Sequence, residues 1–125
     1  MKFYRCLACG SIVAKINSVG ESPWCCGKPM MEIKPGVTEA ATEKHIPVIT
    51  RNGNEVTATV GSILHPMDPD HYIEWIYFET CCGGTFRFLK PGDAPKASIL
   101  LREGEKFIAA DAYCNKHGLW SITLD

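Results

Sequence analysis

Residues 46–61, IPVITRNGNEVTATVG, contain two runs rich in β-branched side chains with Asn52-Gly53-Asn54 between them. β-Branched residues are enriched in strands, and an Asn-Gly step between two such runs favours a hairpin turn. The stretch therefore predicts a β-hairpin formed by Ile46–Arg51 and Glu55–Gly61.

The same signal recurs along the chain, and no segment shows a convincing helical period. Turn residues separate the runs, as in Cys82-Gly83-Gly84 and Pro91–Pro95. Tyr72–Glu79 is apolar at nearly every position, as in a strand buried on both faces. About seven strands in roughly 90 residues predict an immunoglobulin-like seven-stranded β-sandwich. The other strand-like runs are Val37–Ala41, Thr85–Leu89, Ser98–Arg102, Phe107–Tyr113 and Leu119–Leu124.

Residues 1–36 form a distinct segment ahead of the sandwich, which we assign to 37–125. The segment contains four of the seven cysteines and ends at the turn signal Lys34-Pro35-Gly36. A unit below about 40 residues rarely folds without a metal or disulfides. We therefore predict a mainly β chain with a small four-cysteine metal-stabilised module at its N-terminus.

Composition excludes several classes of function. No apolar run approaches the about 20 residues that span a bilayer, and the first residues lack the apolar stretch of a secretory signal, so we expect a cytoplasmic protein with no membrane partner. Residues 1–36 carry a net charge of +3 and residues 37–125 a net charge of −4. Without a clustered basic stripe we expect no nucleic acid, although the basic start could attract an acidic partner protein.

The N-terminal cysteines have the spacing of metal ligands. Cys6 and Cys9 form a C-x2-C-G motif, whereas Cys25 and Cys26 are adjacent and need an irregular turn to point at one ion. An odd cysteine count argues against a fully paired disulfide framework. Four thiolates suit zinc or a single iron, and two disulfides or a structural zinc site remain as alternatives.

A second set of ligands involves every histidine of the chain together with a cysteine. Imidazole and thiolate bind transition metals well, and five ligands leave one position of an octahedral ion open for chemistry. Copper held by His45, Cys114 and His117 is an alternative, but no Met follows His117 and two histidines would be unexplained. The set is His45, His65, His71, Cys114 and His117.

Both ligand sets resemble known families. Cys6-x2-Cys9-Gly10 with Cys25-Cys26-Gly27-Lys28-Pro29-Met30 resembles desulforedoxin, and Glu43–Pro47, His65–Met67, His71–Ile76 and Ala112–Trp120 resemble superoxide reductase. Together the whole chain resembles the desulfoferrodoxin family. The resemblance implies two Fe ions per chain, one held by four cysteines and one by four histidines in a plane with Cys114 axial.

The resemblance also implies the activity and the residues that assist it. It implies one-electron reduction of superoxide to hydrogen peroxide, a homodimer, and a rubredoxin-like electron donor. Lys44 would steer superoxide and help protonate the product, and Glu43 would occupy the sixth position of the oxidised iron. A non-enzymatic electron carrier and a zinc-stabilised binding module are the competing functions. Cys81 and Cys82 belong to neither site, and are either reduced turn thiols or a reactive pair.

Overall fold

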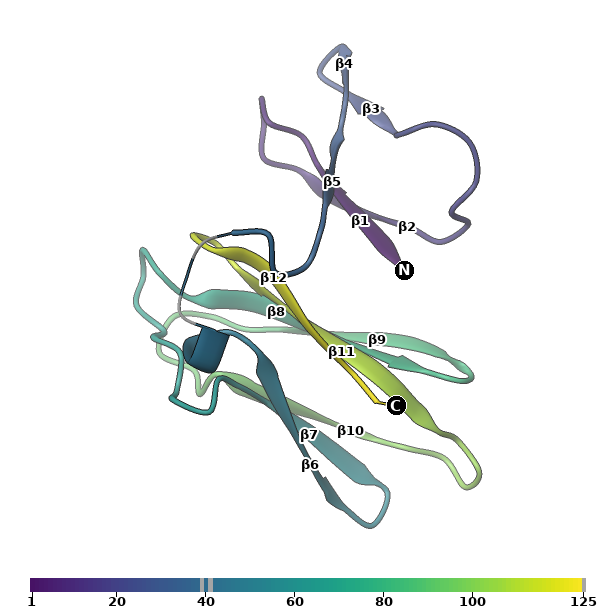
Figure 1. Ribbon diagram of the computed structural model, residues 1–125, viewed down its shortest axis with the longest axis vertical. Coiled ribbons are helices and arrows are strands. Elements are labelled where there is room, and N and C mark those ends of the chain that lie inside the picture. Colours follow the sequence, from purple (N-terminus) through teal and green to yellow (C-terminus); the bar gives the residue numbers. More distant parts are fainter. Residues whose placement is uncertain (39, 41, 125) are drawn as a thin grey trace. The chain divides into compact units, whose positions relative to one another are not determined.

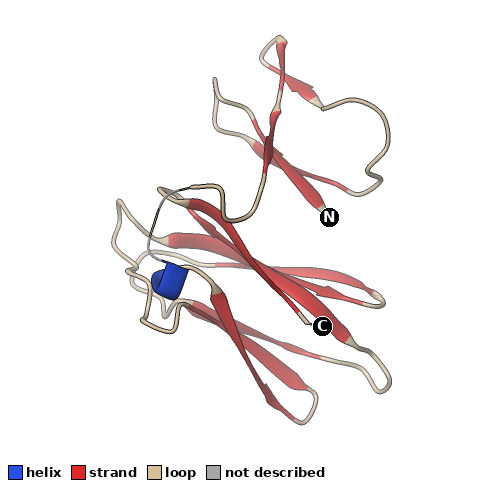
Figure 2. Ribbon diagram, in the orientation of Figure 1, coloured by secondary structure: helices blue, strands red, loops and turns tan. Residues whose placement is uncertain are grey.

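Strands make up nearly all the regular structure of the chain. The computed structural model describes residues 1–38, 40 and 42–124 and divides into two compact units, Met1–Lys34 and Pro35–Asp125 (Figure 1). Among the described residues the only helical segment is the short 3₁₀ turn η1 (Thr42–Lys44), seen in blue in Figure 2. The same residues contain no helix with the length and hydrophobicity needed to cross a membrane. The expected mainly β class is confirmed.

The first unit consists of a small sheet and a separate hairpin. β1 (Lys2–Arg5) lies between β2 (Ile12–Lys15) and β5 (Met31–Ile33), and pairs with both in antiparallel fashion. β3 (Trp24–Cys25) and β4 (Lys28–Pro29) form the hairpin. The buried hydrophobic residues of this unit are Phe3, Tyr4, Cys6 and Met30, and Cys25 packs against the last three. A core of this size gives little stability by itself, so this unit depends on the chemistry of its cysteines.

The second unit contains seven strands in two antiparallel sheets. Three strands form one sheet in the order β10-β7-β6, and four form the other in the order β12-β11-β8-β9. The strands are β6 (Pro47–Asn52), β7 (Glu55–Val60), β8 (Ile73–Thr80), β9 (Gly83–Phe88), β10 (Lys96–Leu100), β11 (Phe107–Cys114) and β12 (Gly118–Thr123).

The hairpin predicted from residues 46–61 is present as β6 and β7. Its turn is Gly53-Asn54, and Gly53 has φ +62°, which suits the first central position of a type II′ turn. Along β7, Val56, Ala58 and Val60 alternate with more exposed residues and are fully buried. This alternation turns one face of the sheet towards the core, as the period of two in the sequence predicts.

The core joins the two sheets through apolar side chains of both. Cys114, a predicted metal ligand, belongs to this core and is fully buried. The metal site therefore adjoins the best-packed part of the unit. The core residues are Val56, Ala58, Val60, Ile73, Ile76, Phe78, Ile99, Leu101, Phe107, Ala110, Ala112 and Cys114.

The topology is that of an immunoglobulin-like sandwich with one strand displaced. In the constant-type immunoglobulin order the fourth strand joins the sheet of the first two, whereas here β9 pairs with β8. The chain then crosses to β10, which pairs with β7. The connection from β8 to β9 is thus a short hairpin, and the crossover comes one strand later.

Two details of the expected strands were wrong. Val37, Thr38 and Ala40 are not in a strand, and the remaining two positions of the run 37–41 lie outside the described residues. The predicted turn at Cys82-Gly83-Gly84 is shifted, because both glycines lie in β9 and the turn residues are Cys81 and Cys82. Position 84 of the strand requires glycine, because a Cβ there would clash with the Tyr77 ring and its hydroxyl.

Candidate metal centres

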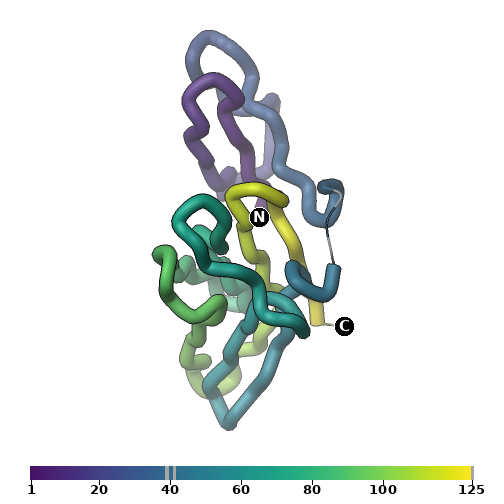
Figure 3. The backbone as a smooth tube through the Cα atoms, turned by 90° about the vertical axis from the view of Figure 1, so that its left-hand side faces the viewer, coloured from purple at the N-terminus to yellow at the C-terminus, as the bar shows by residue number. Residues whose placement is uncertain are grey.

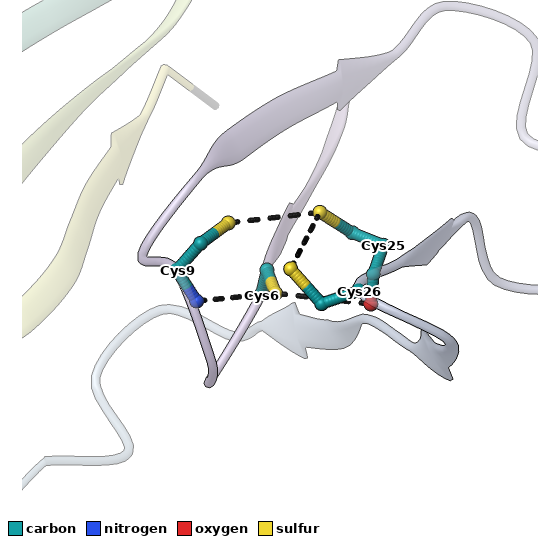
Figure 4. A group of neighbouring side chains, drawn as sticks. All are labelled: Cys6, Cys9, Cys25 and Cys26. Carbon is teal, nitrogen blue, oxygen red and sulfur yellow. Dashed lines mark hydrogen bonds between the residues drawn. The ribbon is translucent and has the colours of Figure 1, made fainter.

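The four N-terminal cysteines converge at one point, as Figure 4 shows. Cys6 directly follows β1, and the next turn closes with hydrogen bonds from the Gly10 amide to the Cys6 carbonyl (2.8 Å) and from the Cys9 amide to the Cys6 sulfur (3.5 Å). The C-x2-C-G motif thus forms a tight knuckle. Cys25 ends β3, and all four sulfurs lie within 4.8 Å of one another.

The adjacent cysteines adopt the irregular turn that the sequence requires. Cys26 and Gly27 are the two turn residues of the β3–β4 hairpin, and both have positive φ (54° and 74°), as in a type I′ turn. Cys26 is the only non-glycine residue with positive φ in the described part of the chain. The strained backbone brings the Cys25 and Cys26 sulfurs to 3.9 Å from each other.

These spacings fit a tetrahedral four-thiolate metal site. Sulfurs placed tetrahedrally about 2.3 Å from a metal lie about 3.8 Å apart. The Cys9 and Cys25 sulfurs are 3.6 Å apart, and those of Cys25 and Cys26 are 3.9 Å apart. None of the four cysteines forms a disulfide. The donor set suits a single iron or zinc equally, because both accept four thiolates.

Crowding moves the thiol pKa values in opposite directions. A hydrogen bond between its sulfur and the Ser11 hydroxyl lowers the pKa of Cys9 to about 6. Hydrogen bonding to the Cys6 and Cys9 sulfurs raises the pKa of Cys25 to about 12. A metal ion must therefore displace protons from this cluster, and its charge is what lets four thiolates share the space.

The four histidines of the second unit form a closed square. Each imidazole packs edge to face against its two neighbours in the order His45, His65, His71, His117, with ring centroids 4.6–5.0 Å apart. The interplanar angles lie between 76° and 85° at all four corners. Four rings standing almost perpendicular to their neighbours direct four nitrogens towards a common centre.

The nitrogen spacings fit an ion at the centre of this square. His45 Nε2 lies 3.1 Å from His65 Nε2 and 3.1 Å from His117 Nδ1. Nitrogens at the corners of a square about 2.1 Å from a metal lie about 3.0 Å apart. The fourth corner supports the same conclusion, since His71 Nε2 is the only buried side-chain nitrogen or oxygen without a hydrogen-bond partner among the described residues.

Burial favours the neutral form of two of the imidazoles, which is the form that binds a metal. Burial lowers the pKa of His65 to about 4, and burial also lowers the pKa of His71. His65 Nδ1 donates to the Pro66 carbonyl at 2.7 Å, so that Nε2 carries the free lone pair. His45 stacks on Trp120 at a centroid distance of 5.0 Å, and the Trp120 indole N–H donates to the His117 carbonyl.

Cys114 supplies a buried sulfur to the same site. Its sulfur and the nearest ring nitrogens of His45, His65 and His71 lie within 4.8 Å of one another. The His117 amide donates to the sulfur at 3.4 Å, which closes a second C-x2 knuckle. Burial raises the pKa of Cys114, so a positive ion in the square is needed to hold it as a thiolate.

Asn115 ties the two ligand-bearing loops together. Its side-chain amide donates to the Asp70 carbonyl (3.0 Å), and its side-chain oxygen accepts from the Tyr72 amide (3.0 Å). The His71 loop is thereby fixed against the turn that carries Cys114 and His117. Figure 3 shows the loop after β7, in teal, beside the β11–β12 turn, in yellow.

The segment that carries Glu43 and Lys44 is anchored by the start of the loop that follows β7. The Glu43 carbonyl accepts from the Ile63 amide (2.9 Å) and the Ser62 hydroxyl (3.2 Å), and both predicted assisting side chains are exposed. Gly61 permits this contact. A Cβ at Gly61 would lie 2.8 Å from the Lys44 backbone and 2.3 Å from the Ile63 carbonyl oxygen.

The structure thus gathers the predicted ligands into two groups, with His117 joining the second through its 3.1 Å spacing to His45, and leaves Cys81 and Cys82 apart from both. Sequence reasoning assigned no role to Gly61, Asn115 or Trp120. The positive φ of Gly61 follows a strand end, where a turn glycine is ordinary, so only the three-dimensional contact reveals its importance.

Comparisons with known proteins agree with this geometry. The family model described as desulfoferrodoxin matches residues 37–123. A desulfoferrodoxin of Nitratidesulfovibrio vulgaris is 43% identical over 119 residues, covering 95% of this chain and 93% of that protein. A desulfoferrodoxin homolog of Archaeoglobus fulgidus is 44% identical over 122 residues, covering 96% and 94%.

Solved structures of superoxide reductases also resemble this chain, one of them over nearly its whole length. The superoxide reductase of Treponema pallidum superposes with a TM-score of 0.82 at 33% identity, covering 97% of this chain and 98% of that one. A superoxide reductase of Giardia intestinalis, called the 1Fe form, covers 66% of this chain and 98% of its own, with a TM-score of 0.55 and 34% identity.

We predict that Gly61→Ala empties the histidine site while leaving the four-cysteine site loaded. The added Cβ must push the Lys44 backbone, and with it His45, out of the square. Gly53→Ala is the matched control, because Gly53 also has positive φ but meets nothing within 4 Å. Both variants should lose about 1–3 kcal/mol of stability from backbone strain. Metal analysis of each purified variant should show about one ion per chain for Gly61→Ala and two for Gly53→Ala; equal metal contents would contradict the role of Gly61.

Proposed function

Because this chain belongs to the desulfoferrodoxin family, we infer that it is a superoxide reductase, which reduces superoxide by one electron to hydrogen peroxide. The observation that carries the inference is the closed square of four imidazoles with one buried cysteine sulfur beside it. Five donors leave one position for a small anion. A structural metal site has no use for such a vacancy.

The two donor groups fit the two iron centres of this family. We assign the first iron to Cys6, Cys9, Cys25 and Cys26 in a desulforedoxin-like module, 1–36, and the second to His45, His65, His71, His117 and Cys114 in the superoxide reductase domain, 37–125. The Cys114 sulfur lies within 4.8 Å of the nearest ring nitrogens of His45, His65 and His71. An iron held by these five residues would keep one position for a small anion.

Each ligand has a task that follows from its surroundings. Iron held by these residues would supply, in its ferrous form, the one electron that with two protons converts superoxide to hydrogen peroxide. The neutral imidazoles add no charge, and the Cys114 thiolate leaves the ferrous site with a net charge of +1, which still attracts an anion. The thiolate also donates electron density, which favours outward electron transfer.

Lys44 and Glu43 are proposed to serve the open position. The 37–125 domain carries a net charge of −4, so superoxide needs a local positive feature to approach. Lys44 directly precedes the ligand His45, its side chain is exposed, and its backbone is fixed through Gly61. We assign to Lys44 the steering of superoxide and a hydrogen bond that assists protonation of the product. Glu43, on the same anchored segment, would occupy the sixth position after oxidation.

The supply of electrons and the assembly of the protein complete the proposal. A rubredoxin-like donor would deliver electrons to a homodimer in the cytoplasm. The exposure of Cys9 and Cys26 supports a contact of the donor with the first unit, because electron transfer needs a redox centre close to the surface. A purely electron-carrying protein would need neither the open position nor Lys44.

The stoichiometry of superoxide consumption tests the function. Fully reduced protein should produce one hydrogen peroxide for each superoxide consumed, with no dioxygen, and should turn over when an electron donor is supplied. Dismutation would give half as much peroxide together with dioxygen. Release of dioxygen, or no reaction of the reduced protein with superoxide, would contradict the assignment.

Lys44→Ala should slow the second-order reaction with superoxide by about tenfold or more and flatten its dependence on ionic strength. Lys106→Ala is the matched control, because it removes the same charge from an exposed lysine at the opposite end of β11. Pulse radiolysis at several salt concentrations measures both effects. Equal rates and slopes in the two variants would remove Lys44 from the mechanism.

A further inference from the structure

We propose that Cys81 and Cys82 form a second redox site, a dithiol that reduces hydrogen peroxide to water and closes to a vicinal disulfide. The two residues form the turn of the β8–β9 hairpin, both are exposed, and their sulfurs lie 3.4 Å apart. The proposal rests on the proposed function only for the source of peroxide, which is the product of that reaction.

The two sulfurs have different surroundings, which gives them different tasks. The Lys106 amide donates to the Cys81 sulfur at 3.2 Å, and the Cys81 amide donates to the Lys106 carbonyl at 2.9 Å. The backbone donor lowers the pKa of Cys81, while the neighbouring Cys81 sulfur raises the pKa of Cys82. Cys81 is therefore the thiolate nucleophile, and Cys82 is the protonated partner.

A network of hydrogen bonds around Thr80 also holds the turn in shape. The Cys82 amide donates to the Thr80 hydroxyl oxygen at 3.2 Å, and that hydroxyl donates to the Glu105 carboxylate. Glu105 also accepts from the Arg102 amide at 3.0 Å. Both sulfurs are thus presented to solvent on a fixed frame, and a small oxidant can reach them.

The reaction balances with one peroxide and two thiols. The Cys81 thiolate attacks one peroxide oxygen, the O–O bond breaks, and the departing hydroxide takes a proton to become water. Cys81 is now a sulfenic acid. The Cys82 sulfur then attacks the Cys81 sulfur, its proton leaves with the sulfenic hydroxyl as a second water, and the S–S bond forms. Peroxide is reduced, and two thiols become one disulfide.

The product would be easy to reopen. Neighbouring Cα atoms are about 3.8 Å apart, whereas ordinary disulfides span about 4.4–6.8 Å between Cα atoms. A strained disulfide is reduced readily by thiol–disulfide exchange, so a dithiol reductant can regenerate the pair.

The site lies far from the histidine centre. Phe107 pairs with Thr80 at one end of β8 and β11, and Cys114 pairs with Ile73 at the other end. About eight residues of strand at about 3.3 Å each separate Cys81 from the ligand end. Figure 1 shows the β8–β9 turn at the opposite end of the sheet from η1. Oxidation of this pair therefore need not disturb the metal ligands.

Peroxide titration of the metal-loaded chain tests the proposal without relying on superoxide activity. After equimolar hydrogen peroxide and alkylation, trypsin should release residues 52–87, whose only cysteines are Cys81 and Cys82. We expect this peptide to lose both alkylation tags, and to regain them after treatment with a dithiol. The Cys25-Cys26 pair is the internal control, because it is also adjacent but belongs to the four-cysteine cluster. Trypsin does not cleave before Pro29 or Pro35, so this pair is released in residues 16–44, which should stay unoxidised.

Single variants test the assignment of roles. Cys82→Ser should accumulate a sulfenic acid on Cys81 that dimedone traps, whereas Cys81→Ser should react at least about tenfold more slowly. Two unoxidised thiols in residues 52–87 after excess peroxide would overturn the proposal. So would equal labelling of both variants, or a disulfide-linked dimer on a non-reducing gel in place of the internal bond.

Discussion

The antiparallel register between β8 and β11 fixes the histidine centre. Ile73 pairs with Cys114 after an irregularity at the end of the ladder, so the loop before β8 and the turn after β11 meet at one edge. Asn115 locks them together through Asp70 and Tyr72. The loop before β8 contributes His65 and His71, and the end of β11 with its turn contributes Cys114 and His117. The segment that carries His45 then completes the square.

The two metal centres differ in how they relate to the stability of the units that hold them. The second unit has a continuous apolar core, and its metal site is placed on the margin of a fold that packing already stabilises. The first unit has four buried hydrophobic residues, one of which is the ligand Cys6. Its metal is therefore part of what holds the unit together, and the positive φ at Cys26 is a strain that metal binding offsets. The histidine centre therefore depends on the fold of the second unit, whereas the fold of the first unit depends on its four-cysteine metal centre.

Local features of the sequence predicted individual turns and strands, whereas contacts between residues far apart in the sequence could not be predicted. The Gly53-Asn54 turn, the alternation of buried and exposed residues along β7, and the tight Cys26-Gly27 turn follow from residues a few positions apart. The pairing of β9 with β8 instead of β10 does not, because the hydrophobic period predicts which face of a strand is buried but not which strand lies beside it. The roles of Gly61 and Asn115 could not be predicted for the same reason, since Gly61 lies against Lys44 and Asn115 bonds to Asp70, both far away in the sequence. Val37–Ala41 is apolar enough for a strand, yet its described residues pair with no neighbouring strand.

We propose that four imidazoles and one thiolate hold an iron with its sixth position open. A crystal structure of the reduced, iron-loaded protein, with anomalous data at the iron edge, measures this directly. Two iron peaks are expected. One should lie about 2.3 Å from four cysteine sulfurs, and the other about 2.1 Å from four histidine nitrogens, with Cys114 as its fifth and last protein ligand. A single peak, an ion bound by fewer than four histidines, or a sixth protein ligand in the reduced state would contradict it.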